Sequence, residues 1–323
     1  MKKRSIALLL LLVLLTGCGA KTEEAPWQTA YRETGKYLQE QDTLSAGSVG
    51  GEWAVIGLSR AGLLSDKAAQ SYEITAEDYV KQADSGRLDR SKSTENSRTI
   101  LGLTAAGYDA SNVAGVDLTS GLSDMNYLRI QGLNGPIWAL IALDCHSYDI
   151  PQCAEGGEQT TREGLVAEIL TSQCSDGGWT LAGDTADVDM TAMALTALAP
   201  YKDDAEVKAA VDAALTYLSD AQQADGGFMS WGAANSESCA QVIVALTTLG
   251  IDPTSDERFI KEGGTVLDAL CAFACEGGGF RHSSDQAEPD GMATEQGFYA
   301  LVAYDRFRQG QTRLFDMTDI EVK

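Results

Sequence analysis

Hydrophobic residues recur along the chain in compact segments that alternate with longer, more polar ones. One column of the aligned segments holds a leucine, each preceded by Gly or Ala, and the steps between these leucines are 45, 40, 52, 51 and 55 residues. Such steps are typical of helix-pair repeats. The six apolar segments are 51–62, 97–107, 136–147, 188–199, 240–250 and 294–305, and their leucines are Leu58, Leu103, Leu143, Leu195, Leu246 and Leu301.

The intervening segments are amphipathic, with apolar residues on one helical stripe and charged residues elsewhere, as in AEVKAAVDAALTYLSDAQ. They cover residues 27–41, 74–83, 123–129, 161–173, 205–221 and 265–274. Apolar inner helices and amphipathic outer helices could form an open solenoid or a closed ring. An open array requires polar terminal repeats, which neither end provides. The pattern therefore predicts an all-α fold, a single-domain α6/α6 toroid of six inner and six outer helices.

The N-terminus has the three parts of a secretory signal: a basic start, an apolar run and small residues before Cys18. The apolar run is too short to span a membrane as a helix. The sequence Leu15-Thr16-Gly17-Cys18 resembles the lipobox of bacterial lipoproteins. This resemblance implies that residues 1–17 are removed, that Cys18 is acylated, and that the protein is lipid-anchored to the extracytoplasmic side of a bacterial membrane.

The predicted organisation after the signal is a short tether over residues 18–25, a toroid over 26–307 and a C-terminal tail over 308–323. Loss of residues 1–17 would remove three positive charges and change the net charge from −23 to −26. Such an acidic protein should repel nucleic acid, so a nucleic-acid partner is excluded.

Six cysteines follow Cys18, an even number that permits disulfides in an exported chain. Cys145 and Cys153 are the pair we expect to be bonded, since a helix end and the following loop can meet. Cys271, Cys275 and His282 could form a metal site, because two residues four apart share a helix face. Packing thiols and a loop histidine are the interpretation we favour, so no metal is predicted.

The turns between outer and inner segments carry a repeated glycine motif: QCSDGGW (173–179), QQADGGF (222–228) and the degraded EGGGF (276–280). These turns resemble the Gln-x-x-Asp-Gly-Gly-aromatic repeats of the terpene cyclase and protein prenyltransferase superfamily, whose fold is the α6/α6 toroid. Paired glycines permit tight or left-handed turns. The resemblance extends over residues 26–307 and supports the fold more strongly than any activity.

The stretch DVDMTAMAL (187–195) resembles two groups within that superfamily. Class II cyclases such as squalene-hopene cyclase carry Asp-x-Asp-Asp-Thr-Ala, which would make Asp189 the general acid, although Met190 replaces the last aspartate. The transcobalamin and intrinsic factor group has a corresponding inner helix and binds cobalamin without catalysis. No cofactor is certain, and cobalamin is one candidate ligand.

In the repeat alignment Glu52, Asp189 and Glu295 share one column, with Arg98, Asp187 and Glu237 adjacent. All lie where inner helices begin, so parallel helices should bring them to one mouth of the barrel. Carboxylates at helix starts commonly cap free amides. We favour that role for Asp187 and leave Asp189 open between capping and contact with a ligand.

Trp53 and Trp138 fall in the column after Glu52 and would add aromatic surface to the same mouth. The predicted ligand-binding residues are therefore Glu52, Trp53, Arg98, Trp138, Asp187, Asp189, Glu237 and Glu295.

The preferred function is non-catalytic binding of a small amphipathic ligand, or a surface partner, at this mouth. The alternatives are a cyclase-like enzyme that uses Asp189, and a structural or adhesion module with a filled barrel axis.

Overall fold

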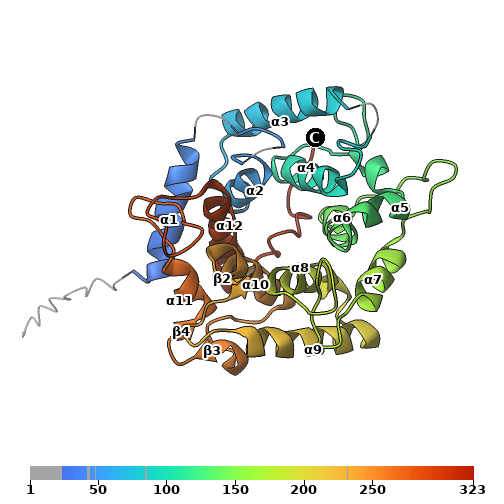
Figure 1. Cartoon of the computed structure of the whole chain (residues 1–323). Coiled ribbons are helices and arrows are strands. Elements are labelled where there is room, and N and C mark those ends of the chain that lie inside the picture. The colour runs from blue at the N-terminus through green and yellow to red at the C-terminus, as the bar shows by residue number, and fades with distance from the viewer. Residues whose placement is uncertain (1–23, 42–43, 48, 84–85, 231) are drawn as a thin grey trace, which may run out of the picture.

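The computed structural model describes residues 24–41, 44–47, 49–83, 86–230 and 232–323, and its helices form a closed ring (Figure 1). The predicted all-α α6/α6 toroid is confirmed. The inner helices are α2 (Glu52–Arg60), α4 (Ser93–Ala105), α6 (Asn134–Asp144), α8 (Val188–Leu198), α10 (Ser236–Leu249) and α12 (Gly291–Arg308).

The outer layer follows the predicted amphipathic segments. It consists of α1 (Pro26–Gln39), α3 (Asp66–Lys81), α7 (Arg162–Thr171), α9 (Ala205–Ala221) and α11 (Val266–Cys271). Its third position is filled by short turns, η1 (Leu118–Leu122), α5 (Met125–Leu128) and η2 (Arg129–Gln131). The minor elements are η3 (Ala199–Tyr201), η4 (Glu257–Phe259) and two hairpins, β1 (Met229–Ser230) with β2 (Ala233–Ala234) and β3 (Ile260–Lys261) with β4 (Gly264–Thr265).

The aligned leucines all lie in the core, each at most 2 % exposed. The small residues before them allow neighbouring side chains to approach the helix backbone. At Gly57 an added Cβ would come within 2.8 Å of the Phe298 ring on α12. The repeat pattern therefore identified both the helices and the faces on which they pack.

The glycine motifs form tight turns that join outer to inner helices. Gly177 and Gly226 have φ of 97° and 89°, a left-handed conformation that favours glycine. The Gln173 side chain donates to the carbonyls of Gly177 (2.7 Å) and Ala210 (2.9 Å), which ties its turn to the next outer helix. The motif aromatics Trp179, Phe228 and Phe280 are fully buried. This motif thus connects neighbouring repeats.

The ring closes where the first outer helix packs against the last repeat. The amide of Gly279, in the turn before α12, donates to Thr34 on α1 at 3.1 Å. Trp27 at the start of α1 packs edge-on against Tyr304 near the end of α12, with ring centroids 5.1 Å apart. These contacts join the first described helix to the last repeat and exclude an open solenoid.

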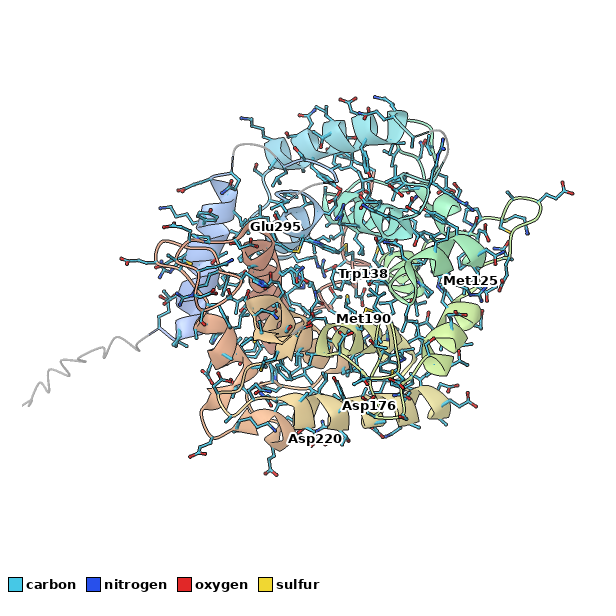
Figure 2. The ribbon with its side chains drawn as sticks, viewed as in Figure 1. Met125, Trp138, Asp176, Met190, Asp220 and Glu295 are labelled. Carbon is cyan, nitrogen blue, oxygen red and sulfur yellow. The ribbon has the colours of Figure 1, made fainter. Side chains whose placement is uncertain are left out.

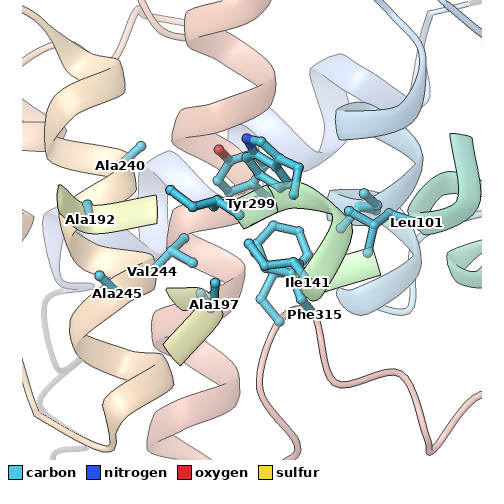
Figure 3. Packing of buried hydrophobic residues seen from close by; sticks show 14 of the residues in the cluster. Leu101, Ile141, Ala192, Ala197, Ala240, Val244, Ala245, Tyr299 and Phe315 are labelled. Carbon is cyan, nitrogen blue, oxygen red and sulfur yellow. The ribbon is translucent and has the colours of Figure 1, made fainter. Parts of the chain in front are cut away.

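The segment after α12 is an integral part of the core. Phe315 packs edge-on against Trp138 on α6 at 5.8 Å, and the amide of Met317 donates to the carbonyl of Cys145 at 2.7 Å. Figure 3 shows Phe315 beside Ile141 and near Tyr299, within the ring of inner helices. The predicted tail therefore plugs the barrel at the carboxyl ends of the inner helices, which we call the tail end.

Cys145 and Cys153 do not form the disulfide that we predicted. The thiol of Cys145 is buried and lies 3.8 Å from the hydroxyl of Thr104 on α4, whereas the amide of Cys153 is bound by Gln159 in the following loop. The two cysteines thus make separate contacts, and both thiols are free.

No helix among the described residues is long and apolar enough to cross a membrane. The predicted signal and the acylated Cys18 lie outside the described residues, so the lipid anchor stays a prediction.

Candidate functional site

A pocket of about 510 Å³ opens at the mouth, the end of the barrel where the inner helices begin. It lies between the first turns of α8, α10 and α12 and the loops that lead into them. Its lining residues are Asp189, Met193, Ser230, Ala233, Asn235, Glu237, Gln241, His282, Met292 and Gln296. We call this region the open side of the mouth.

The three helices that form the pocket begin with side-chain caps, and Asp187 is one of them. Its carboxylate accepts from the amide of Met190 at 2.8 Å, as Asn235 does for α10 and Asp290 for α12. Burial is the main cause that raises the pKa of Asp187. Asp187 therefore has the capping role that we favoured.

Asp189 lies two residues further along α8 and lines the pocket. Its Oδ1 atom is buried without a hydrogen-bond partner among the described residues, and the same holds for the hydroxyl oxygen of Ser230. A buried polar atom without a partner is costly, so such atoms in native proteins call for an explanation such as a bound water or ligand. Asp189 is thus distinguished from the capping carboxylates by its lack of a partner.

The opposite wall of the pocket holds a histidine–carboxylate contact and an amide network. Nδ1 of His282 lies 2.9 Å from both carboxylate oxygens of Glu237. Gln241 donates to Gln296 at 3.1 Å and to the Tyr299 hydroxyl at 2.7 Å. The wall is thereby fixed in one arrangement, with a carboxylate at its edge.

Glu52 and Glu295 lie at the same mouth but are enclosed, and with Arg98 they form what we call the sealed side (Figure 2 labels Glu295). They are 0 % and 2 % exposed. Glu52 accepts from the amide of Gly47 at 2.7 Å and pairs with Arg98 at 3.1 Å, while Glu295 accepts from the amide of Gly50.

Burial is the main cause that raises the pKa of both carboxyl groups of the sealed side. The pKa of Glu295 reaches about 7, although the amide of Gly50 opposes the shift. For Glu52 the Arg98 guanidinium is the leading opposing influence on the pKa. Both carboxylates accept hydrogen bonds from the protein. The repeat alignment placed them in one column with Asp189, but their surroundings in the structure differ from those of Asp189.

Trp53 and Trp138 lie on the barrel axis, outside the lining of the open side. Their ring centroids are 5.0 Å apart, and Trp53 also packs against Tyr299 at 6.0 Å. Together with Phe315 these rings fill the axis below the mouth. The structure thus places Asp189 and Glu237 together in the pocket and the other six predicted residues elsewhere.

Several pocket residues were missed by the sequence analysis. Gln241 lies four residues after Glu237, so helical periodicity could have placed it on the same face. His282 and Ser230 come from loops whose course the repeat does not set. No group of three or more His, Cys, Asp or Glu side chains suited to a metal ion occurs among the described residues.

No protein-family model and no curated protein matches this sequence. Solved structures do match. One is the crystal structure of an unsaturated glucuronyl hydrolase, responsible for the degradation of glycosaminoglycan, from Bacillus sp. GL1, with a TM-score of 0.54 and 14 % identity over 90 % of this chain and 98 % of that one. At this identity the likeness shows the α6/α6 toroid fold alone, and it does not single out the terpene cyclase and prenyltransferase superfamily.

Proposed function

We propose that this protein binds a small, water-soluble ligand rich in hydrogen-bond donors, such as a saccharide or amino sugar, in the open side of the mouth. The observation that carries the proposal is the unpartnered Oδ1 of Asp189 in a pocket of about 510 Å³. A hydroxyl or ammonium group of a ligand would supply the missing donor.

The other groups in the pocket suit the same ligand class. The Glu237 carboxylate and the side-chain amides of Gln241 and Gln296 offer acceptors and donors along the walls, while Met193 and Met292 add apolar surface. A sugar ring has polar edges and apolar faces, which matches this mixture. The volume lies within the range of about 300–1,000 Å³ found for small-molecule sites.

The proposal includes the lipid anchor on Cys18, an extracytoplasmic location on a bacterial membrane, and membership of the prenyltransferase-repeat proteins through the glycine motifs. Cobalamin fits the pocket less well. A whole corrinoid is considerably larger than the ligands that such a volume encloses, and Trp53 and Trp138 pack against each other on the axis below the mouth. We keep the corrinoid only as one probe among others.

The test is a binding screen by thermal shift and calorimetry on the unacylated protein, with neutral sugars, amino sugars, cell-wall fragments and corrinoids. Asp189→Asn should weaken binding of a hit by about 10- to 100-fold, the equivalent of one hydrogen bond to a charged group. Asp187→Asn is the matched control, because it removes the same charge but keeps a good cap. If both variants bind like wild type, Asp189 is not the ligand contact.

A second candidate function is hydrolysis of a glycosidic bond. It is favoured by the presence of two carboxylates, Asp189 and Glu237, on neighbouring helices of one pocket. Glycosidases use such a pair as acid and as base or nucleophile. Incubation of a bound oligosaccharide with the protein and detection of new reducing ends would distinguish turnover from binding.

The cyclase alternative receives less support. Carbocation chemistry requires a dry cavity lined by aromatic side chains, whereas the aromatic residues here pack against one another on the axis. An assay with isoprenoid substrates would overturn this preference if it yielded a cyclic product that Asp189→Asn no longer forms.

A further inference from the structure

The start of α1 lies at the tail end of the barrel. Trp27 packs against Tyr304 in the last turns of α12, and the guanidinium of Arg308 lies 6.0 Å from the Trp27 ring. Before the helix, Glu24 is held back against α1 by Arg32 at 3.0 Å and by Thr29 at 3.2 Å. The chain that leads to Cys18 therefore leaves the barrel beside the carboxyl end of α12.

Only five residues separate Glu24 from Cys18. At full extension this link spans about 20 Å. The distance along α12 from Tyr304 back to its first residue is also about 20 Å, at 1.5 Å per residue. The loop containing His282 and the hairpin β1–β2 line the pocket at that end of the barrel. A link would thus have to be fully stretched to end level with the first turn of α12.

We infer that the membrane-anchored protein turns the tail end toward the lipid bilayer and opens its mouth to the aqueous side. This inference rests on the acylation of Cys18 included in the proposed function. It deepens that function, because a ligand that enters a mouth facing away from the membrane arrives from solution and not from the lipid phase. A soluble solute is therefore the ligand class that the geometry favours over a membrane-borne isoprenoid.

The inference also places the tail segment, the chain after α12, next to the membrane. Residues of the tail segment, with Arg60 and Arg306 bound to Asp319, cover the end of the barrel that would face the headgroups. Arg60 is nearly enclosed, since its side chain is 2 % exposed. The hydrogen-bonded tail segment thus covers part of this end, beside an open pocket of about 500 Å³ that Ile141 and Phe315 help to line.

Fluorescence energy transfer from the protein to headgroup-labelled vesicles tests the orientation. Fluorescent amino acids would replace Met292 at the mouth or Gln309 at the tail end in the full acylated chain, so that both reporters lie at the two ends of α12. Both positions are exposed, and because Met292 lines the pocket, transfer is measured without ligand. Transfer should be several-fold greater from position 309 than from position 292.

Two variants separate the possible failures. Cys18→Ser should abolish transfer from both positions. If the unmutated chain does not bind vesicles, the prediction of a lipid anchor on Cys18 is wrong, whereas the orientation is judged only from the bound protein. Insertion of a long Gly/Ser segment before Glu24 should make transfer from the two positions nearly equal, because a flexible linker no longer fixes the end that faces the membrane. Equal transfer with the native link, or greater transfer from position 292, overturns the inference.

Discussion

The open and sealed sides of the mouth use carboxylates from one column of the repeat alignment in different ways, and Glu295 lies a turn further into its helix than Glu52 and Asp189 do. On the sealed side, Glu52 and Glu295 accept backbone amides and lie next to Arg98. On the open side, Asp189 keeps a carboxylate oxygen without a partner among the described residues. A carboxylate at the start of an inner helix therefore indicates a ligand contact only when the neighbouring loop leaves it unpaired.

The difference between the two sides predicts that substitution of Glu52 reduces stability the most. Glu52→Ala removes the acceptor for the amide of Gly47 and one of the two carboxylate partners of Arg98, which keeps Glu95 at 2.7 Å. We expect a loss of about 3 to 4 kcal/mol in the free energy of unfolding, the lower part of the range for broken buried pairs. Asp189→Ala should change that free energy far less, because Oδ1 of Asp189 has no hydrogen-bond partner among the described residues. Urea unfolding followed by circular dichroism measures both, and equal losses would show that the two sides do not differ.

The next effect is a pH dependence from Glu295. Its folded pKa of about 7 lies above its ordinary value of 4.5, so the native state holds the proton more tightly than the unfolded chain. Stability from this group is present below pH 4.5 and is lost as the pH rises to about 7, by about 3 kcal/mol at most.

The groups that face Glu295 are the amide of Gly50, Glu52, Arg98 and Asp290. Glu295→Gln should flatten the fall in unfolding free energy between pH 4.5 and 7, measured as urea midpoints across that range. Asp189→Asn is the control from the open side. The predicted contrast fails if the wild-type protein is equally stable throughout the range or if both variants follow the same curve.

A smaller effect on the free energy of unfolding should distinguish Asp187, the cap of α8, from Asp189. Asp187→Ala leaves the amide of Met190 without its acceptor and should cost about 1 kcal/mol, while Asp187→Asn should cost little because Asn caps equally well. Neither change should alter ligand affinity in calorimetry. A large loss of affinity in Asp187→Asn would place Asp187 in the binding site.

The smallest effect on stability should come from the Glu237–His282 pair. The His282 side chain is 45 % exposed, so His282→Ala should reduce the free energy of unfolding by about 0.5 kcal/mol or less. Ligand affinity should change more than stability, because the histidine lines the pocket. Equal thermal shifts of ligand-bound wild type and variant would exclude His282 from the site.

The fold was predictable because it follows from local periodicity repeated six times. The leucine column and the glycine turns are read directly from the sequence, and both depend on contacts between adjacent repeats. Asp187 could also be assigned from sequence, since a cap bonds to an amide only three residues away.

The grouping of the site residues was less predictable. Asp189 and Glu237 were expected at the mouth, but their separation from Glu52 and Glu295 depends on which loop covers each helix start. The amides of Gly47 and Gly50 donate to the two glutamates of the sealed side, whereas Oδ1 of Asp189 has no hydrogen-bond partner among the described residues. Loop paths of this kind follow no repeat and show no signal in the sequence.

The sequence by itself determined the helix pairs, their inward faces and their turns, because each depends on neighbours within a repeat or on the next one. Only the tertiary structure decided that Phe315 fills the axis, that Cys145 and Cys153 stay apart, and that one half of the mouth is sealed. These outcomes depend on contacts between residues far apart in the chain, such as Glu295 with Gly50 and Trp138 with Phe315, which become neighbours only when the ring closes.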